Sequence, residues 1–98
     1  MEFIFEEDFR LVYKGKGKKV YKQKVFVVDN DKQLLVQIGV MVKEVHRSEM
    51  YYFESLNPEV NSVFNKTQLT YRVAKNKATH HFAKLDWGQI LEGGLDYE

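Results

Sequence analysis

The stretch from Tyr13 to Tyr21 carries the most suggestive set of side chains in this chain. It reads Tyr-Lys-Gly-Lys-Gly-Lys-Lys-Val-Tyr, so lysines and glycines lie between two tyrosines. Lysine ammonium groups neutralise phosphates and tyrosine rings stack on bases, so these residue types suit a groove that follows a nucleic-acid backbone. The same pattern also suits a solvated hairpin tip whose lysines prevent pairing between sheet edges. The glycine spacing matches neither the P-loop nor the dinucleotide-binding fingerprint.

The distribution of charge supports a binding surface, although the net charge is only +1. Residues 9–24 hold seven basic side chains and residues 62–85 hold five, with no acidic side chain in either segment. Separated blocks of charge create a surface field that the net charge hides. The candidate nucleic-acid-binding residues are therefore the basic and tyrosine side chains of the two blocks: Tyr13, Lys14, Lys16, Lys18, Lys19, Tyr21, Tyr71, Arg72, Lys75 and Lys77.

Other chemistries find little support. The chain has no cysteine, and Ser48, Ser55 and Ser62 lie outside any Gly-x-Ser-x-Gly context. His80 and His81 would point to opposite faces of a strand, so they could not bind one metal ion together. We therefore expect no enzyme activity, no catalytic residue, no metal site and no cofactor.

The elements that must position these residues are mostly strands. The clearest covers Gln33 to His46, where apolar and β-branched residues alternate with a period of two. We expect one buried face made of Leu34, Val36, Ile38, Val40 and Val42. Gly39 in the middle predicts a bulge or a sharp bend.

The remaining elements follow from shorter patterns and turn residues. Strands are expected at residues 9–14, 19–28, 50–53, 67–74 and 78–85, with Tyr51 and Phe53 on a core face. Residues 2–5 either form a short strand or simply dock Phe3 and Phe5. Turns are expected at residues 15–18, 29–32, 47–49 and 75–77. Asn57 and Pro58 predict a helix over 58–64, and Asp86 predicts a capped helix over 87–92.

From residue 19 onward the expected order is strand, strand, strand, helix, strand, strand, which is the element order of the OB-fold. The fold class predicted is mostly β with a minor α component: a small, five- to six-stranded, antiparallel, partly open barrel with one or two short helices. A chain of 98 residues predicts a single domain over residues 1–98.

The acidic N-terminal segment, the absence of cysteine and a longest uncharged apolar run of nine residues predict a soluble cytoplasmic protein that does not enter a membrane. The function predicted is a small, non-enzymatic nucleic-acid-binding module, with single strands favoured. The alternative is a protein-binding inhibitor or adaptor domain of the phage or mobile-element type, which would meet an acidic surface on a host protein. A homodimer is left open. The two functions differ in whether the basic blocks must converge on one face beside exposed aromatic rings.

Overall fold

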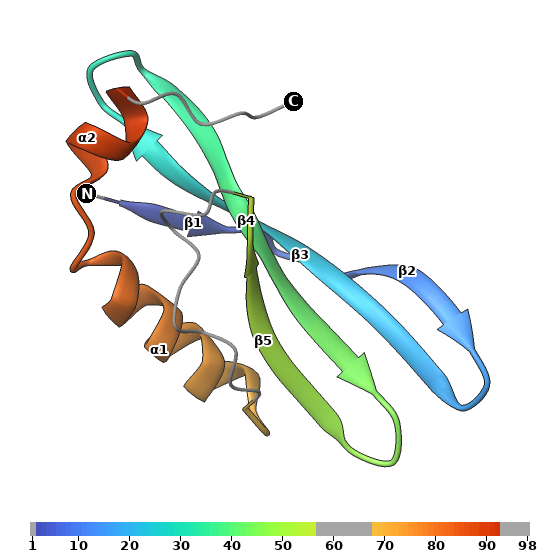
Figure 1. Ribbon diagram of the computed structural model, residues 1–98. Helices are drawn as coiled ribbons and strands as arrows, with labels where there is room; N and C mark the ends of the chain where they lie inside the picture. The colour runs from blue at the N-terminus through green and yellow to red at the C-terminus, as the bar shows by residue number, and fades with distance from the viewer. Residues whose placement is uncertain (1, 57–67, 93–98) are drawn as a thin grey trace.

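A computed structural model describes residues 2–56 and 68–92 of the chain. It shows an antiparallel five-stranded sheet followed by two short helices (Figure 1). The strands are β1 (Phe3–Phe5), β2 (Arg10–Gly15), β3 (Lys18–Asp29), β4 (Leu34–Val45) and β5 (Glu49–Ser55). The helices are α1 (Tyr71–Phe82) and α2 (Trp87–Glu92).

Strand β3 organises the sheet, because it pairs with β4 along its whole length and with two short strands on its other side. Strand β1 pairs with residues 25–27 of β3, and β2 pairs with residues 18–22. Strand β5 completes the order β1-β3-β4-β5 beside β4. Among the described residues the sheet is not closed. The mostly β, antiparallel character with five strands and two short helices is therefore confirmed, whereas the predicted partly open barrel is supported only in part.

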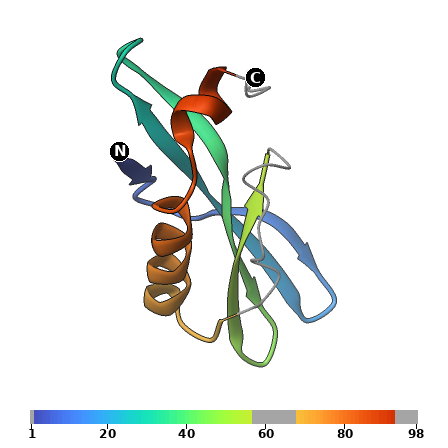
Figure 2. The ribbon, with the colours of Figure 1, turned by 60° about the vertical axis from the view of Figure 1, so that its left-hand side comes forward.

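Both helices lie on one side of the sheet, and the far ends of two hairpins extend beyond them (Figures 1 and 2). We call this extension the arm. It is made of β2, residues 18–22 of β3, 42–45 of β4 and 49–52 of β5. The molecule is elongated as a result, with principal extents of 44 × 24 × 22 Å.

The core lies between the helices and the face of the sheet that carries the odd-numbered side chains of β3. We call this the inner face and the opposite side the outer face. Helix α1 packs against β5, and Phe82 is completely buried. The centre of its ring lies 5.0 Å from the ring centre of Phe53 and 5.2 Å from that of Phe3. The core residues are Val25, Val27, Val36, Ile38, Met41, Tyr51, Phe53, Ala74, Ala78, Phe82, Trp87 and Ile90. The predicted core position of Tyr51 and Phe53 is confirmed.

The predicted irregularity in the long strand β4 is confirmed, and it lies beside Gly39. Val25 pairs with Gly39 and Phe26 pairs with Gln37, so Ile38 is an extra residue without a partner on β3. A side chain at Gly39 would collide with the Phe53 ring, which explains why glycine is required at this position. The bulge shifts the alternation of β4 by one residue, as β-bulges do.

This shift overturns part of the predicted buried face of β4. Val36 and Ile38 are in the core as expected, but after the bulge Met41 takes the inward position. Val40 is only half-buried, and Leu34 is 41% exposed near the end of the strand. Val42 is buried, but its side chain lies on the outer face, opposite Lys22.

The predicted strands at 67–74 and 78–85 and the predicted turn at 75–77 are wrong, because residues 71–82 form α1. Ala74, Ala78 and Phe82 are buried at intervals of four residues, which is helical spacing. Thr70 caps the helix, since its Oγ1 accepts a hydrogen bond from the Val73 amide at 3.3 Å. With this helix in place, the OB-fold order is not realised.

The other local predictions are confirmed where the structure describes them. Lys16 and Gly17 form a two-residue turn, in which Gly17 has a φ of 67°. Asp29 Oδ1 accepts from the Lys32 amide at 3.2 Å in the next turn. Asp86 Oδ1 accepts from the Gln89 amide at 3.2 Å and caps α2. The helix predicted over 58–64 lies outside the described residues.

Candidate functional site

The two faces of the arm differ in how their charges are compensated. On the outer face, Lys18 Nζ lies 3.0 Å from Glu44 Oε1, and Lys22 Nζ lies 3.5 Å from Glu54 Oε1. Hydrogen bonds from the Tyr52 hydroxyl and from Lys18 lower the pKa of Glu44 below its ordinary value of 4.5. Each of these lysines therefore has an acidic partner.

On the inner face, two lysines face each other without an acid. Lys14 lies directly opposite Lys19 in the β2–β3 ladder, and both side chains are exposed. Neither these two lysines nor Lys16 in the adjoining turn forms an ion pair with any residue in 2–56 or 68–92. Like charges directly opposite each other destabilise a sheet. The fold tolerates this repulsion at the tip of the arm, and a bound anion would relieve it.

Lys14 and Lys19, together with Lys18, line a hollow of about 340 Å³ at the tip of the arm. Backbone and side chains from the β2–β3 turn form one wall, and the end of β4 forms the other. A volume of this size falls within the range of small-ligand pockets. The lining residues are Lys14, Gly15, Gly17, Lys18, Lys19, Val45 and His46.

The two tyrosines of the first basic block lie on opposite faces of the arm. Tyr21 is half-buried on the inner face, where Lys43 Nζ lies 5.4 Å from its ring centre. Tyr13 is 54% exposed, and its ring lies over Gly15 on the outer face, where a Cβ would collide with it. Only Tyr21 therefore shares a face with Lys14 and Lys19.

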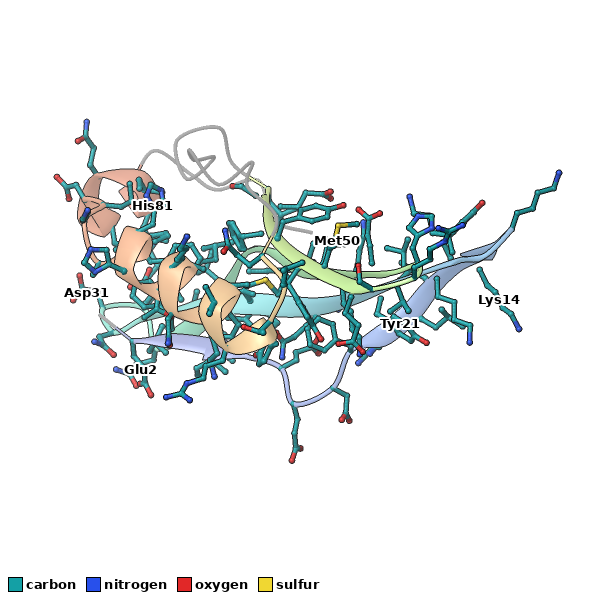
Figure 3. The ribbon with its side chains drawn as sticks, turned by 90° about the horizontal axis from the view of Figure 1, so that it is seen from below. Glu2, Lys14, Tyr21, Asp31, Met50 and His81 are labelled. Carbon is teal, nitrogen blue, oxygen red and sulfur yellow. The ribbon has the colours of Figure 1, made fainter. Side chains whose placement is uncertain are left out.

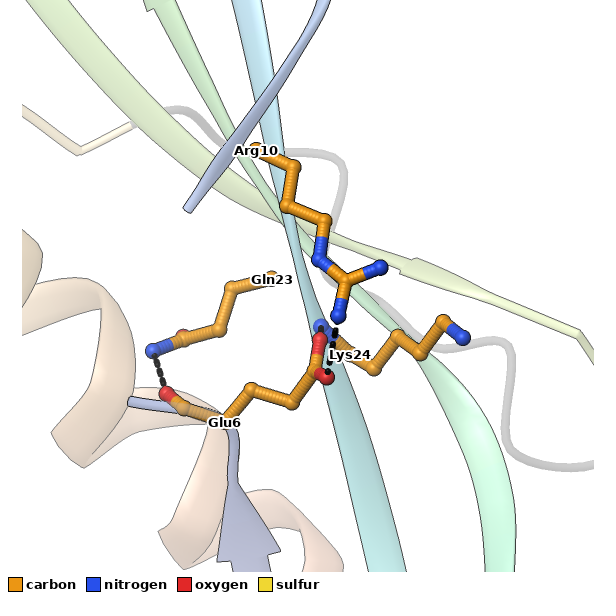
Figure 4. A network of polar contacts seen from close by, with 4 residues as sticks. All are labelled: Glu6, Arg10, Gln23 and Lys24. Atoms are coloured by element: carbon orange, nitrogen blue, oxygen red, sulfur yellow. Dashed lines mark hydrogen bonds and ion pairs between the residues drawn. The ribbon is translucent and has the colours of Figure 1, made fainter. Parts of the chain in front are cut away.

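A buried glutamine fixes the base of the arm to the rest of the fold (Figure 4). Gln23 is 3% exposed. Its Nε2 donates to the backbone oxygen of Glu6, and its Oε1 accepts from the Tyr71 hydroxyl at 3.1 Å. The Glu6 carboxylate accepts from the Lys24 amide at 2.9 Å and lies 3.6 Å from Arg10. This network joins β3, the segment between β1 and β2, and α1.

Tyr71 therefore has a structural position. Besides its hydrogen bond to Gln23, the centre of its ring lies 5.4 Å from the ring centre of Phe9 and 5.8 Å from that of Tyr51. Sequence reasoning missed Gln23 as a structural residue. In the sequence, Gln23 lies two residues before Val25 and four before Val27, so an alternating strand places its amide on the same face as these apolar side chains. That position was the available signal.

The second basic block does not form one surface with the first. Arg72 and Lys77 are five residues apart on α1, so they project about 140° apart around the helix axis. Lys75 Nζ lies over the Phe5 ring at 5.0 Å from its centre. Figure 3 shows Lys14 near one end of the molecule and α1 toward the other, with Tyr21 between them. The turn predicted at 75–77 would have carried part of the second basic block, but residues 75–77 lie inside α1.

Two further residues, Lys43 beside Tyr21 and His46 beside the hollow, were missed by sequence reasoning. Lys43 pairs across the sheet with Tyr21, and it also lies 3.7 Å from Glu49. His46 follows the end of β4 and lines the hollow. Their proximity to the lysines depends on the register of β3 against β4, which includes the bulge at Ile38.

The described residues contain neither a candidate metal site nor a candidate membrane-spanning helix. No group of three or more His, Cys, Asp or Glu side chains within 2–56 and 68–92 could hold a metal ion. Neither helix in this part of the chain is long and apolar enough to cross a membrane. No protein-family model matches the chain, and neither a curated protein nor a solved structure matches it.

Proposed function

We propose that the arm binds the phosphate backbone of a nucleic acid, with single strands favoured, and that the protein acts without catalysing a reaction. The observation that carries this proposal is the pair Lys14 and Lys19, which face each other with no acidic partner among the described residues. An anion between them would replace a repulsion with two attractions. Phosphate oxygens repeat along a nucleic acid and match such a site.

The surroundings of the lysine pair fit a flexible strand. Lys16 adds a third positive charge at the turn, and the hollow provides space beside Lys14 and Lys19. Tyr21 provides a ring on the same face, to which a base could stack after displacing Lys43. A base of a single strand is free to stack on this ring, so duplex DNA or RNA serves as the comparison ligand in the test.

The proposal is tested by measuring the affinity for a labelled oligothymidylate of about 16 nucleotides, the upper end of the site sizes of single-strand-binding modules. The inner-face double variant Lys14→Gln/Lys19→Gln is compared with the outer-face double variant Lys22→Gln/Lys24→Gln, which has the same net charge. The inner-face variant should bind much more weakly. The slope of log affinity against log salt should also become shallower by about 1.4 for the two lost phosphate contacts.

Four results bear on this proposal. Retained binding by the outer-face variant, together with loss in the inner-face variant, supports it. Equal weakening in both variants would show that only the total charge matters. Absence of binding by the unaltered protein at low salt, with folding confirmed by circular dichroism, would refute the proposal. Tighter binding of a duplex of equal length would refute the preference for single strands.

The alternative function, an inhibitor or adaptor domain that binds a host protein, is favoured by a different observation. The two basic blocks do not converge, and strand β2 presents exposed apolar side chains at the edge of the sheet.

A further inference from the structure

Strand β2 has an open edge. It pairs with β3 on one side, and no strand within the described residues pairs with its other side. Gly15 and Lys18 close the two-residue turn and therefore exchange hydrogen bonds, so by the alternation of an antiparallel ladder the backbone N–H and C=O of Lys14 point outward. An edge of this kind can accept another strand.

The side chains along this edge are unusually apolar for a solvent-exposed strand. Leu11, Val12 and Tyr13 follow one another and are 51%, 53% and 54% exposed. A run of three exposed apolar residues is avoided on surfaces unless it has a function, because it promotes association. Val12 lies at an irregularity in the register between Leu11 and Tyr13, which leaves its side chain outside the regular alternation with β3.

The charges of β2 restrict what can pair with it. Arg10 and Lys14 lie on either side of the apolar run, and no acidic residue occurs from residue 9 to residue 24. The register irregularity at Val12 puts Arg10 on the outer face, opposite Lys22, and Lys14 on the inner face, opposite Lys19. Two copies paired edge to edge would bring two acid-free basic segments together, and their like charges would repel. An incoming strand with acidic residues would instead be attracted.

We propose that the edge of β2 binds an extended segment of a partner protein, rich in acidic and apolar residues, as an added strand of the sheet. Backbone hydrogen bonds at Lys14 provide the docking, and the apolar run covers the apolar residues of the incoming segment. The basic charge of this edge, where Lys14 has no acidic partner among the described residues, selects acidic sequences and disfavours a second copy of the same chain. This proposal does not rest on nucleic-acid binding: both involve Lys14, but this one uses the backbone edge and the apolar run of β2, whereas the other uses the Lys14–Lys19 pair on the inner face.

The test uses a capped synthetic peptide of alternating glutamate and valine, and follows the protein amides by NMR. Binding should slow hydrogen exchange at the Lys14 amide. A peptide of the same charge with proline in place of each valine should bind much more weakly, because each proline lacks an N–H and fixes φ near the polyproline II value, which disfavours a paired strand. A peptide with lysine in place of glutamate should not bind either.

Substitutions on the protein give the matched control. Leu11→Lys places a charge in the apolar run and should abolish peptide binding, and Val12→Lys provides a second variant with the same expectation. Leu35→Lys adds the same charge at a leucine that is also 51% exposed but lies at the opposite end of the sheet, so it should retain binding. Circular dichroism confirms that each variant is folded.

Several outcomes would overturn the proposal. They are equal binding of the proline peptide, retained binding in both Leu11→Lys and Val12→Lys, and protection of the Lys14 amide by self-association at high protein concentration without peptide. Leu11→Lys adds a positive charge beside the inner face, so oligonucleotide binding should persist in this variant. Failure of peptide binding and failure of nucleic-acid binding are therefore distinguishable.

Discussion

Replacing one inner-face lysine with an acid should strengthen the fold while weakening its proposed function. Lys14→Glu converts the repulsion between Lys14 and Lys19 into an attraction across the β2–β3 ladder. Cross-strand charge pairs contribute about 0.2–1 kcal/mol each, and the exposure of both side chains reduces the effect through screening, so the gain should be about 0.5–1 kcal/mol. For a domain of this size, that gain corresponds to an increase in Tm of roughly 2–8 °C.

Two control variants carry the same change in net charge. Lys18→Glu places a second acid beside Glu44, whose carboxylate lies 3.0 Å from Lys18 Nζ, and should lower Tm. Lys24→Glu changes an exposed outer-face residue and should affect oligonucleotide binding less than Lys14→Glu does. Thermal unfolding is measured at low and high salt, because screening should shrink the differences in Tm. A decrease in Tm for Lys14→Glu, or equal loss of oligonucleotide affinity in Lys14→Glu and Lys24→Glu, would refute the reasoning.

Three further predictions concern stability. Phe82→Ala should lower the free energy of unfolding by about 3–5 kcal/mol, measured by urea denaturation, because it removes a completely buried ring. Gln23→Met should lower it by about 1–3 kcal/mol, because the Glu6 carbonyl and the Tyr71 hydroxyl both lose their partner. The lowered pKa of Glu44 stabilises the fold at pH values above the ordinary 4.5, and this contribution is lost as the pH falls through the lowered value. Glu44→Gln should therefore be less stable than the unaltered protein at neutral pH, and the difference in urea midpoint should disappear in acid.

The hairpins could be predicted from the sequence because their signals are local. Alternating apolar residues indicate β3 and β4, and the turn residues at 16–17 and 29–32 join strands that are adjacent in the sheet. The lysine-rich turn was predicted for the same reason. Its position at the end of an arm was not, because that depends on where α1 packs.

Helix α1 was missed because two periodic patterns overlap in one segment. Leu69, Tyr71 and Val73 alternate as in a strand, yet Leu69 is 74% exposed and Val73 is 41% exposed. The residues that decide the structure are Ala74 and Ala78, which repeat at helical spacing and are buried against the sheet together with Phe82. Two alanines form a weak apolar signal in the sequence. In the fold their small size lets the helix backbone approach the sheet closely.

The bulge at Ile38 decides which lysines of the arm lack an acid. Between the turn at 29–32 and the bulge, β3 and β4 pair in one uninterrupted register, in which Asp29 lies opposite Leu34 and Val27 lies opposite Val36. If that register continued without the extra residue, Lys19 would face Glu44 on the inner face. With the bulge, Lys19 faces Val45, and Glu44 moves to the outer face, where it pairs with Lys18.

Without the bulge, the Glu44 carboxylate would therefore lie opposite Lys19 and would neutralise one charge of the Lys14–Lys19 pair. Gly39 permits the irregular geometry at the bulge, where the Phe53 ring leaves no space for a side chain. The structural consequence of this glycine extends about six residues along β4, to the tip of the arm. Because a β-bulge reverses the faces of every residue that follows it, this local backbone feature determines the charge of the proposed binding surface.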